Sequence, residues 1–271
     1  MKSEVLAGVP DHDCYEFKQK THEYCLMIPV LNESGRLQPE LNRALKNGVF
    51  EICDIIILDG GSTDNGAERK YLESLGVNTL LIKTGAGKQS AQLRMGFYFA
   101  VNRGYKGIVT IDGNNKDSIE RTALFIKKLE EGYDFVQGSR FLPGGGSKHT
   151  PFLRYISVRL IHAPLISKAA GYKFTDTTNA FRGYSVKYLT HPQVKIFREV
   201  FNSYELLAYL SVRASQIGLK SIEIPVIRNY PKKGVNPTKI SPVKGNIEIF
   251  RILINTIKGK YNPKDISDGG L

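Results

Sequence analysis

A regular alternation of apolar and amphipathic segments in the first half of the chain most constrains its fold. Four segments are short and apolar almost throughout, as strands buried on both faces are: 24–30, 54–59, 77–84 and 107–112. The stretch after each of them carries apolar residues at helical spacing. Because apolar strands that alternate with amphipathic helices form βαβ units, this pattern predicts an α/β fold with a mostly parallel sheet and helices on both faces.

Three of these strands end at residues that suit a binding site. Pro29 cannot donate a hydrogen bond to a sheet, and Asp59 and Asp112 are acids that directly follow apolar residues. In open parallel sheets, ligands bind beyond the carboxyl ends of the strands. We therefore expect Pro29, Asp59 and Asp112 to surround one crevice.

The second half of the chain is less regular. A glycine-rich loop precedes a basic, apolar-faced helix over 152–170, which we expect to bend at Pro164. A last amphipathic helix over 246–261 forms a C-terminal helical extension before a polar tail. We expect an irregular N-terminal arm, one domain, and a C-terminal helix with its tail, at 1–22, 23–240 and 241–271.

The charge balance points to an anionic partner. The net charge is +12 and the isoelectric point is about 9.5, which suits nucleic acid, anionic lipid or a phosphorylated small molecule, or simply solubility. The cations are spread along the chain without the motifs of a nucleic-acid reader, so we expect no nucleic-acid partner.

The cysteines and the hydropathy indicate where the protein works. Cys14, Cys25 and Cys53 are few and not at metal-ligand spacing, which favours a reducing compartment. We find neither a secretory leader nor an apolar run near the ~20 residues of a membrane span. We expect a cytoplasmic protein, with peripheral contact at the inner face of an anionic membrane as a further option. The helix over 152–170 and the last helix would make that contact, or else pack on the core or form a homodimer.

The stretch TGAGKQS is similar to a phosphate-binding loop but does not match its pattern. That pattern needs a glycine five residues before Gly87 and Ser or Thr after Lys88, whereas Ile82 and Gln89 occupy these places. The stretch is either a plain strand-to-helix turn or a place where Lys88 approaches an anion of the ligand.

Six motifs occur in an order and at intervals that resemble the family 2 glycosyltransferases of the GT-A fold, a Rossmann-like α/β fold. The resemblance is nearest to the dolichyl-phosphate mannose synthase and polyprenyl-phosphate glycosyltransferase branch, and it covers about Tyr24 to Lys239. The motifs are IPVLNESGRL, IILDGGSTDNG, GKQSAQLRMGFYFA, IDGNNKD, QGSRF and TNAFRGYS.

The resemblance implies a pocket for a nucleoside-diphosphate sugar. Pro29 and Glu33 match the first-strand motif that lines this pocket, and Asp59 matches an acid that helps read the base or ribose. Glu33 could instead be a solvated loop acid, and Asp59 a turn former. The second acid of the Asp-Asp-Gly-Ser motif is Gly60 here.

The stretch VTIDGNNKD matches the Asp-x-Asp motif, whose acids hold a divalent cation, Mg²⁺ or Mn²⁺, across the diphosphate of the donor. The three positions of the motif are Asp112, Asn114 and Lys116, and Asp117 follows. Either Asp112 holds the cation with Asn114 and Asp117, or Lys116 lies against the diphosphate and takes over part of the cation's role. A plain turn is the third option. We favour the metal site, because Asp112 would otherwise repel the diphosphate.

The resemblance also implies an acceptor site. Arg140 in QGSR matches an arginine that faces the acceptor phosphate and takes part in catalysis. Arg228 and Lys239 match the basic region that closes over the diphosphate and the acceptor, although this could also be a solvated loop. We further expect Arg182 to pair with Asp176.

The acceptor decides the chemistry. A hydroxyl acceptor needs a general base, for which Glu205 is the candidate and Asp117 the alternative, whereas a phosphate oxygen is already anionic. Glu205 equally suits a plain helix-face acid. We therefore expect an inverting transfer of a hexose-type sugar to a polyprenyl phosphate. The alternatives are transfer to a saccharide hydroxyl in cell-surface polysaccharide synthesis, and a catalytically weakened sugar-nucleotide-binding protein.

Overall fold

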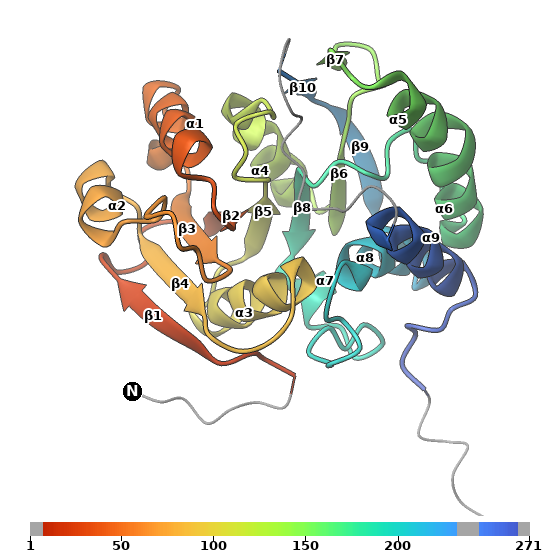
Figure 1. Cartoon of the computed structure of the whole chain (residues 1–271). Coiled ribbons are helices and arrows are strands. Elements are labelled where there is room, and N and C mark those ends of the chain that lie inside the picture. The colour runs from red at the N-terminus through yellow and green to blue at the C-terminus, as the bar shows by residue number, and fades with distance from the viewer. Residues whose placement is uncertain (1–7, 232–243, 265–271) are drawn as a thin grey trace, which may run out of the picture.

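Figure 1 shows the computed structural model, in which residues 8–231 and 244–264 are described. A large twisted sheet runs through the molecule, with helices in front of it and behind it. The described strands are β1 (His12–Glu16), β2 (Tyr24–Val30), β3 (Asp54–Asp59), β4 (Thr79–Lys83), β5 (Gly107–Thr110), β6 (Phe135–Ser139), β7 (Gly146–Lys148), β8 (Arg182–Ser185), β9 (Ser221–Pro225) and β10 (Ile227–Asn229).

The helices alternate with the strands in the first half and cluster in the second. The α-helices are α1 (Ser34–Lys46), α2 (Arg69–Leu75), α3 (Gln89–Asn102), α4 (Thr122–Glu130), α5 (Phe152–Ser157), α6 (Ala163–Ala170), α7 (Val186–Leu189), α8 (Glu205–Gln216) and α9 (Lys244–Ile257). Two 3-10 turns, η1 (Val49–Glu51) and η2 (Ile119–Arg121), and one π-helical turn, η3 (Val158–His162), complete these elements.

The strand order in the large sheet is β1-β4-β3-β2-β5-β8-β6-β9, and β10 pairs with β7 in a small second sheet. β2 lies at the centre, parallel to β3 and β5, while β3 is also parallel to β4. β8 runs antiparallel to both β5 and β6, and β6 is parallel to β9. The prediction of a mostly parallel α/β sheet is confirmed. Its four predicted strands are β2, β3, β4 and β5.

Alternate residues of the central strands pack into two separate cores, one on each face of the sheet. Met27 and Leu58 contribute to the core that α3, α6, α8 and α9 cover. Ile28 and Ile57, next to them in the chain, contribute to the core beneath α1, α2 and α4. This period of two explains why the strands are apolar throughout, because both faces of the sheet exclude water.

The N-terminal segment differs from the irregular arm expected over 1–22. Residues 12–16 form β1, which pairs antiparallel with β4 at the edge of the sheet. Asp54 then holds the following residues, because its carboxylate accepts hydrogen bonds from the backbone N–H groups of Thr21 (3.0 Å) and His22 (3.3 Å). A short edge strand with exposed polar side chains carries almost no hydropathy signal, which is why the sequence pattern missed it.

The helix predicted over 152–170 forms as α5, η3 and α6 in one run. The π-helical turn lies immediately before Pro164, whose missing N–H and ring disturb the regular α-helical ladder. The run ends at Gly171, which takes the left-handed conformation (φ 65°) usual at a helix C-terminus.

The last helix, α9, packs against α6 and α8 and buries Leu253. The C-terminal helix that we predicted therefore packs on the helices of the domain (Figure 1). Within the described parts of the chain, no helix is both long and apolar enough to cross a membrane.

Candidate active site

A cavity of about 580 Å³ lies at the carboxyl ends of β2 and β5, and we name it the sheet-end cavity. Its wall combines residues from the central strands with residues from α8 and α9. Eight of the residues predicted to bind substrate or metal line it: Pro29, Glu33, Lys88, Asp112, Asn114, Lys116, Arg140 and Arg228. The sheet thus brings together residues that are far apart in sequence, as its topology predicts.

Asp112 stands just beyond β5 and is held by three polar side chains. Its Oδ2 accepts a hydrogen bond from Arg228 Nη2 (3.1 Å) and lies 3.4 Å from Asn114 Nδ2. Its Oδ1 lies 3.3 Å from Gln89 Nε2. The side chain is 23% exposed, so that it faces the cavity in a fixed orientation.

The loop after Asp112 follows a path that depends on small and permissive residues. A Cβ at Gly113 would lie 2.5 Å from Val30 Cγ1, so the backbone can pass the end of β2 only without a side chain there. Asn115 adopts a positive φ of 56°, which asparagine tolerates better than most residues. This path turns Asn114 and Lys116 toward the cavity.

Asp117 does not line the sheet-end cavity, which differs from its predicted place among the metal ligands. It is fully buried, and its Oδ2 accepts a hydrogen bond from Arg228 Nη1. Burial raises the pKa of Asp117 to about 6, although the charge of Arg228 counteracts this rise. Burial also disfavours the charged form of Arg228, but attraction to Asp117 and Asp112 outweighs this and raises the pKa of the guanidinium. Arg228 therefore ties Asp117 to Asp112.

The oxygen atoms of Asp112 and Asn114 fit a divalent cation that a bound ligand would also coordinate. Asn114 Oδ1 is buried without a hydrogen-bond partner, and the carboxylate of Asp112 lies beside the same side chain. Carboxylate and amide oxygens are the ligands that Mg²⁺ and Mn²⁺ take. No group of three or more His, Cys, Asp and Glu residues in the described ranges could hold a metal alone. The chain thus supplies part of a coordination sphere.

Asp59 and Gly60 show how the first glycine-rich turn is built. Asp59 Oδ1 accepts hydrogen bonds from the backbone N–H groups of Gly61 (3.2 Å) and Ser62 (2.9 Å), and Asp59 is not part of the cavity lining. Gly60 does line it, and a Cβ there would lie 2.8 Å from Gln92 Nε2. The side chain of a second acid at position 60 would therefore need Gln92 to move.

Two predicted residues of the cavity have partners that the sequence did not indicate. Glu33 accepts a hydrogen bond from Arg36 Nε. Lys88 directly precedes α3, and its Nζ lies 3.0 Å from Glu248 Oε2 on α9. The contact with Glu248 links α9 to the N-terminus of α3 at the rim of the cavity.

Arg140 forms a buried ion pair with Asp176, the acid that we expected to pair with Arg182. Its Nε lies 2.6 Å from Asp176 Oδ2 and its Nη2 lies 2.9 Å from Asp176 Oδ1. Nη2 also donates to Thr178 Oγ1 (2.8 Å), and Nη1 donates to Tyr230 Oη (3.2 Å). The predicted pair of Arg182 with Asp176 is wrong, because β8 directs Arg182 toward backbone carbonyls, including that of Leu207 (2.6 Å).

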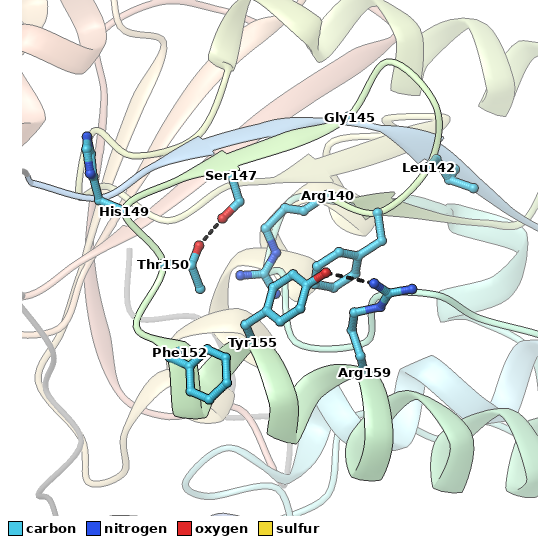
Figure 2. Close-up of a pocket in the computed structure, with 10 residues that line it drawn as sticks. Arg140, Leu142, Gly145, Ser147, His149, Thr150, Phe152, Tyr155 and Arg159 are labelled. Atoms are coloured by element: carbon cyan, nitrogen blue, oxygen red, sulfur yellow. Dashed lines mark hydrogen bonds between the residues drawn. The ribbon is translucent and has the colours of Figure 1, made fainter.

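Arg140 also lines a second cavity of about 540 Å³, which lies beside α5 and the loop after β6 (Figure 2). We name it the aromatic cavity. Aromatic rings and hydroxyl groups come from Phe141, Ser147, Thr150, Phe152 and Tyr155, and the rest of the lining is Arg140, Leu142, Gly145, His149 and Arg159.

Two further predicted residues lie elsewhere. Glu205 begins α8, and its Oε2 accepts a hydrogen bond from the backbone N–H of Ser203 (2.6 Å), so it caps a turn and does not line either cavity. Its alternative interpretation, a helix acid, fits these contacts. Lys239 lies outside the described residues.

Several residues of the sheet-end cavity had no signal in the sequence. Lys83 is buried, which lowers its pKa, and its Nζ donates to the carbonyl of Gly85 (2.6 Å). His162 enters from η3, and burial lowers its pKa to about 4, with Arg182 adding to the effect. Single histidines and lysines carry no recognisable pattern, although π-helical turns often occur at functional sites.

Comparison with known proteins agrees with this geometry. The chain matches the profile of "Glycosyl transferase family 2" over residues 25–191, which is more than half of its length. The chain therefore belongs to this family and is a glycosyltransferase.

Two relatives illustrate the branch of the family. The polyprenol monophosphomannose synthase of Mycolicibacterium smegmatis is 24% identical over 257 residues, covering 89% of this chain and 90% of that protein. The glycosyltransferase AglJ of Haloferax volcanii is 22% identical over 237 residues, covering 86% of this chain and 72% of that protein. The resemblance to the polyprenyl-phosphate branch is confirmed at this level.

Solved structures agree with the fold. Glucosyl-3-phosphoglycerate synthase from Mycobacterium tuberculosis, in complex with Mn²⁺, UDP-glucose and phosphoglyceric acid, superposes with a TM-score of 0.61 at 14% identity. The match covers 89% of this chain and 81% of that one. At this identity the comparison supports the GT-A fold alone.

Proposed function

We propose that this glycosyltransferase inverts the anomeric centre while moving a hexose-type sugar from a nucleoside-diphosphate sugar to a polyprenyl phosphate. One observation carries the choice of acceptor. The described acids that line the sheet-end cavity are Glu33 and Asp112, and each is paired with an arginine. The two candidate bases, Glu205 and Asp117, lie outside the lining. A hydroxyl acceptor would need a general base, whereas a phosphate acceptor does not.

The bond changes balance without a protein base. An oxygen of the acceptor phosphate attacks the anomeric carbon, and a new C–O bond forms on the face opposite the leaving group. The bond from that carbon to the diphosphate breaks, and the nucleoside diphosphate leaves with the electron pair. The nucleophile is already anionic, so the chain has to place the reactants and stabilise charge.

Lys116 and Arg228 suit the charge that develops on the departing diphosphate. Both are nearly buried, line the cavity and belong to segments next to Asp112 in space. A Mg²⁺ or Mn²⁺ ion held by Asp112 and Asn114 would neutralise further diphosphate charge. The low exposure of these groups strengthens their electrostatic effect relative to that of the same groups in water.

The acceptor lipid implies work at a membrane surface. Large apolar side chains are exposed on η3, which leads into α6, and on α9, which packs against α6; among them are Leu160 (68%) and Phe250 (56%). Apolar residues with basic neighbours suit the interface of an anionic membrane. We propose peripheral contact at the inner face of the membrane through these helices.

The test is transfer from a panel of nucleotide sugars to a polyprenyl phosphate in detergent, with Mg²⁺, Mn²⁺ or a chelator present. A lipid-linked sugar formed from one donor supports the proposal, and its loss on chelation identifies the cation requirement. Sugar transfer to saccharide hydroxyls with none to the lipid would contradict the proposed acceptor. Donor binding without turnover on any acceptor would contradict an active enzyme.

A further inference from the structure

A fully buried acid on α1, Glu40, contacts the loop that follows Asp112. Its neighbours on the helix, Leu37 and Leu41, pack into the apolar core on that face of the sheet. Oε2 of Glu40 accepts a hydrogen bond from the backbone N–H of Asn115 (2.9 Å), whereas Oε1 is buried without a hydrogen-bond partner. An acid thus stands among apolar side chains with one defined polar contact.

The stability of the fold does not account for an acid at this place. A buried carboxyl group with one oxygen unpaired destabilises the folded state, whereas a leucine of similar volume would suit the apolar side chains around it. Burial raises the pKa of Glu40 well above its usual range, although the N–H of Asn115 counteracts this rise. The hydrogen bond to Asn115 is the contribution that a leucine could not make.

This hydrogen bond acts on the turn that directs Asn114 toward the sheet-end cavity. Asn115 directly follows Asn114 and adopts its positive φ of 56°, a conformation that the surroundings have to hold in place. Arg43, one helical turn after Glu40, donates from Nη2 to the backbone carbonyl of Asp117. Side chains of α1 therefore hold the backbone of the loop at two positions.

A second element, β10, holds the same loop through its backbone. The N–H of Asn229 donates to the carbonyl of Lys116 (2.8 Å), and the N–H of Ser118 donates to the carbonyl of Ile227 (2.9 Å). These bonds fix the end of the loop, whereas the contact with Glu40 fixes the residue next to Asn114.

We propose that Glu40 is a positioning residue for the Mg²⁺ or Mn²⁺ ion of the sheet-end cavity. By holding the backbone of Asn115, it keeps the side chain of Asn114 beside the carboxylate of Asp112. Glu40 does not line the cavity, so it acts through the loop and not as a ligand. Contacts behind the ligands orient them and contribute to metal affinity. The inference rests on the proposed function, because it concerns the cation that would neutralise the diphosphate.

The first test measures Mn²⁺ binding to the full-length chain, so that it does not depend on turnover. Titration with Mn²⁺ alone is followed by the electron paramagnetic resonance signal of the free ion. Glu40→Leu should weaken Mn²⁺ binding about tenfold, whereas Glu40→Gln, which keeps an acceptor oxygen, should stay within about twofold of the native protein. The control Glu73→Leu makes the same exchange at an exposed acid on α2 and should leave binding unchanged.

The second test measures the order of the loop without metal. Amide hydrogen exchange in a peptide that covers 112–118 should become about tenfold faster in Glu40→Leu, because the N–H of Asn115 loses its acceptor, and should remain slow in Glu40→Gln. Exchange in the buried strand β3 should not change in either variant. A residue that only stabilised the fold would raise exchange in the loop and in β3 together.

Several results would overturn the proposal. Equal Mn²⁺ binding by the native protein and Glu40→Leu would show that the loop keeps its place without Glu40. An equal loss in Glu40→Gln and Glu40→Leu would show that the charge matters and not the acceptor oxygen. Absence of Mn²⁺ binding by the native protein would overturn the cation site itself. Failure of the proposed function is distinct from these results, since it would appear as absent sugar transfer by a native protein that binds Mn²⁺.

Discussion

The two cavities of this chain use arginine in opposite ways. In the sheet-end cavity, Arg140 and Arg228 are buried and each faces a buried aspartate, so they hold the site together as well as face the ligand. In the aromatic cavity, Arg159 is exposed, packs on rings and has no described acid as partner. Charges that are paired inside a protein shape a site, whereas a cation that stacks on rings at the surface keeps a charge that anions in solution can reach.

The largest expected effect concerns the buried pair. Asp176→Asn should lower the free energy of unfolding by about 3–5 kcal/mol, because it leaves the guanidinium of Arg140 buried without its counter-charge. Urea unfolding measures this, and Asp13→Asn on β1, where the acid is exposed, serves as the control. A loss equal to that of the control would show that the pair is not what fixes Arg140.

The next effect concerns the chemistry of the sheet-end cavity. Asp112→Ala should lower kcat/KM for transfer about 10²- to 10³-fold, since the carboxylate of Asp112 lies beside Asn114, whose buried Oδ1 has no hydrogen-bond partner. Steady-state kinetics at several Mg²⁺ or Mn²⁺ concentrations measures the loss. Asp13→Ala should retain the native rate. A fall smaller than threefold would mean that Asp112 does not face the leaving group.

A smaller effect is expected on membrane binding, which involves other residues than the donor site. The double change Phe152→Ser and Leu160→Ser should reduce partition onto anionic vesicles about tenfold, because two exposed apolar side chains are lost. Leu45→Ser on α1 changes a side chain that is 48% exposed on another face and should have no effect. Flotation of the protein with vesicles gives the measurement. An equal loss in all variants would argue against a specific membrane face.

The last effect concerns pH. The pKa of His162 is about 4 in the folded chain, below its ordinary value of 6.5, so the unfolded chain takes up the proton first as the pH falls. The stability that this contributes is present above about pH 6.5 and is lost as the pH falls toward 4, by at most about 2 kcal/mol between pH 7 and 5. His162→Asn should lose correspondingly less stability over this range. Unfolding at both pH values compares the two proteins, and the comparison cancels the titration of other groups. Equal losses would contradict the lowered pKa.

Part of the sheet-end cavity was predictable from the sequence, because several of its residues stand at strand ends. The alternation of strands and helices predicted that Pro29, Asp59 and Asp112 meet at one edge; Pro29 and Asp112 line the cavity, whereas Asp59 binds the turn beyond β3 and does not. The fold class follows from the same alternation. Motif resemblance then supplied the donor chemistry that we propose.

The rest depends on contacts that sequence patterns do not carry. Asp176, the partner of Arg140, lies 36 residues further along the chain in a loop. Only the fold shows that Asp176 pairs with Arg140 and not with Arg182. The aromatic cavity combines a loop with a helix through single rings and hydroxyl groups, which have no periodic pattern. The edge strand β1 is short and polar, so its pairing became visible only in the structure.

The central claim is that the sheet-end cavity binds the nucleoside-diphosphate sugar, and one set of kinetic constants tests it most directly. The donor KM and the acceptor KM for sugar transfer would be measured for the native protein, for Lys116→Met and for the control Lys168→Gln, which changes an exposed lysine on α6 outside the cavity. We predict that Lys116→Met raises the donor KM about tenfold and leaves the acceptor KM within about a factor of two, because Lys116 lines this cavity, and that Lys168→Gln changes neither constant. An unchanged donor KM in Lys116→Met, or an equal rise in Lys168→Gln, would contradict the claim.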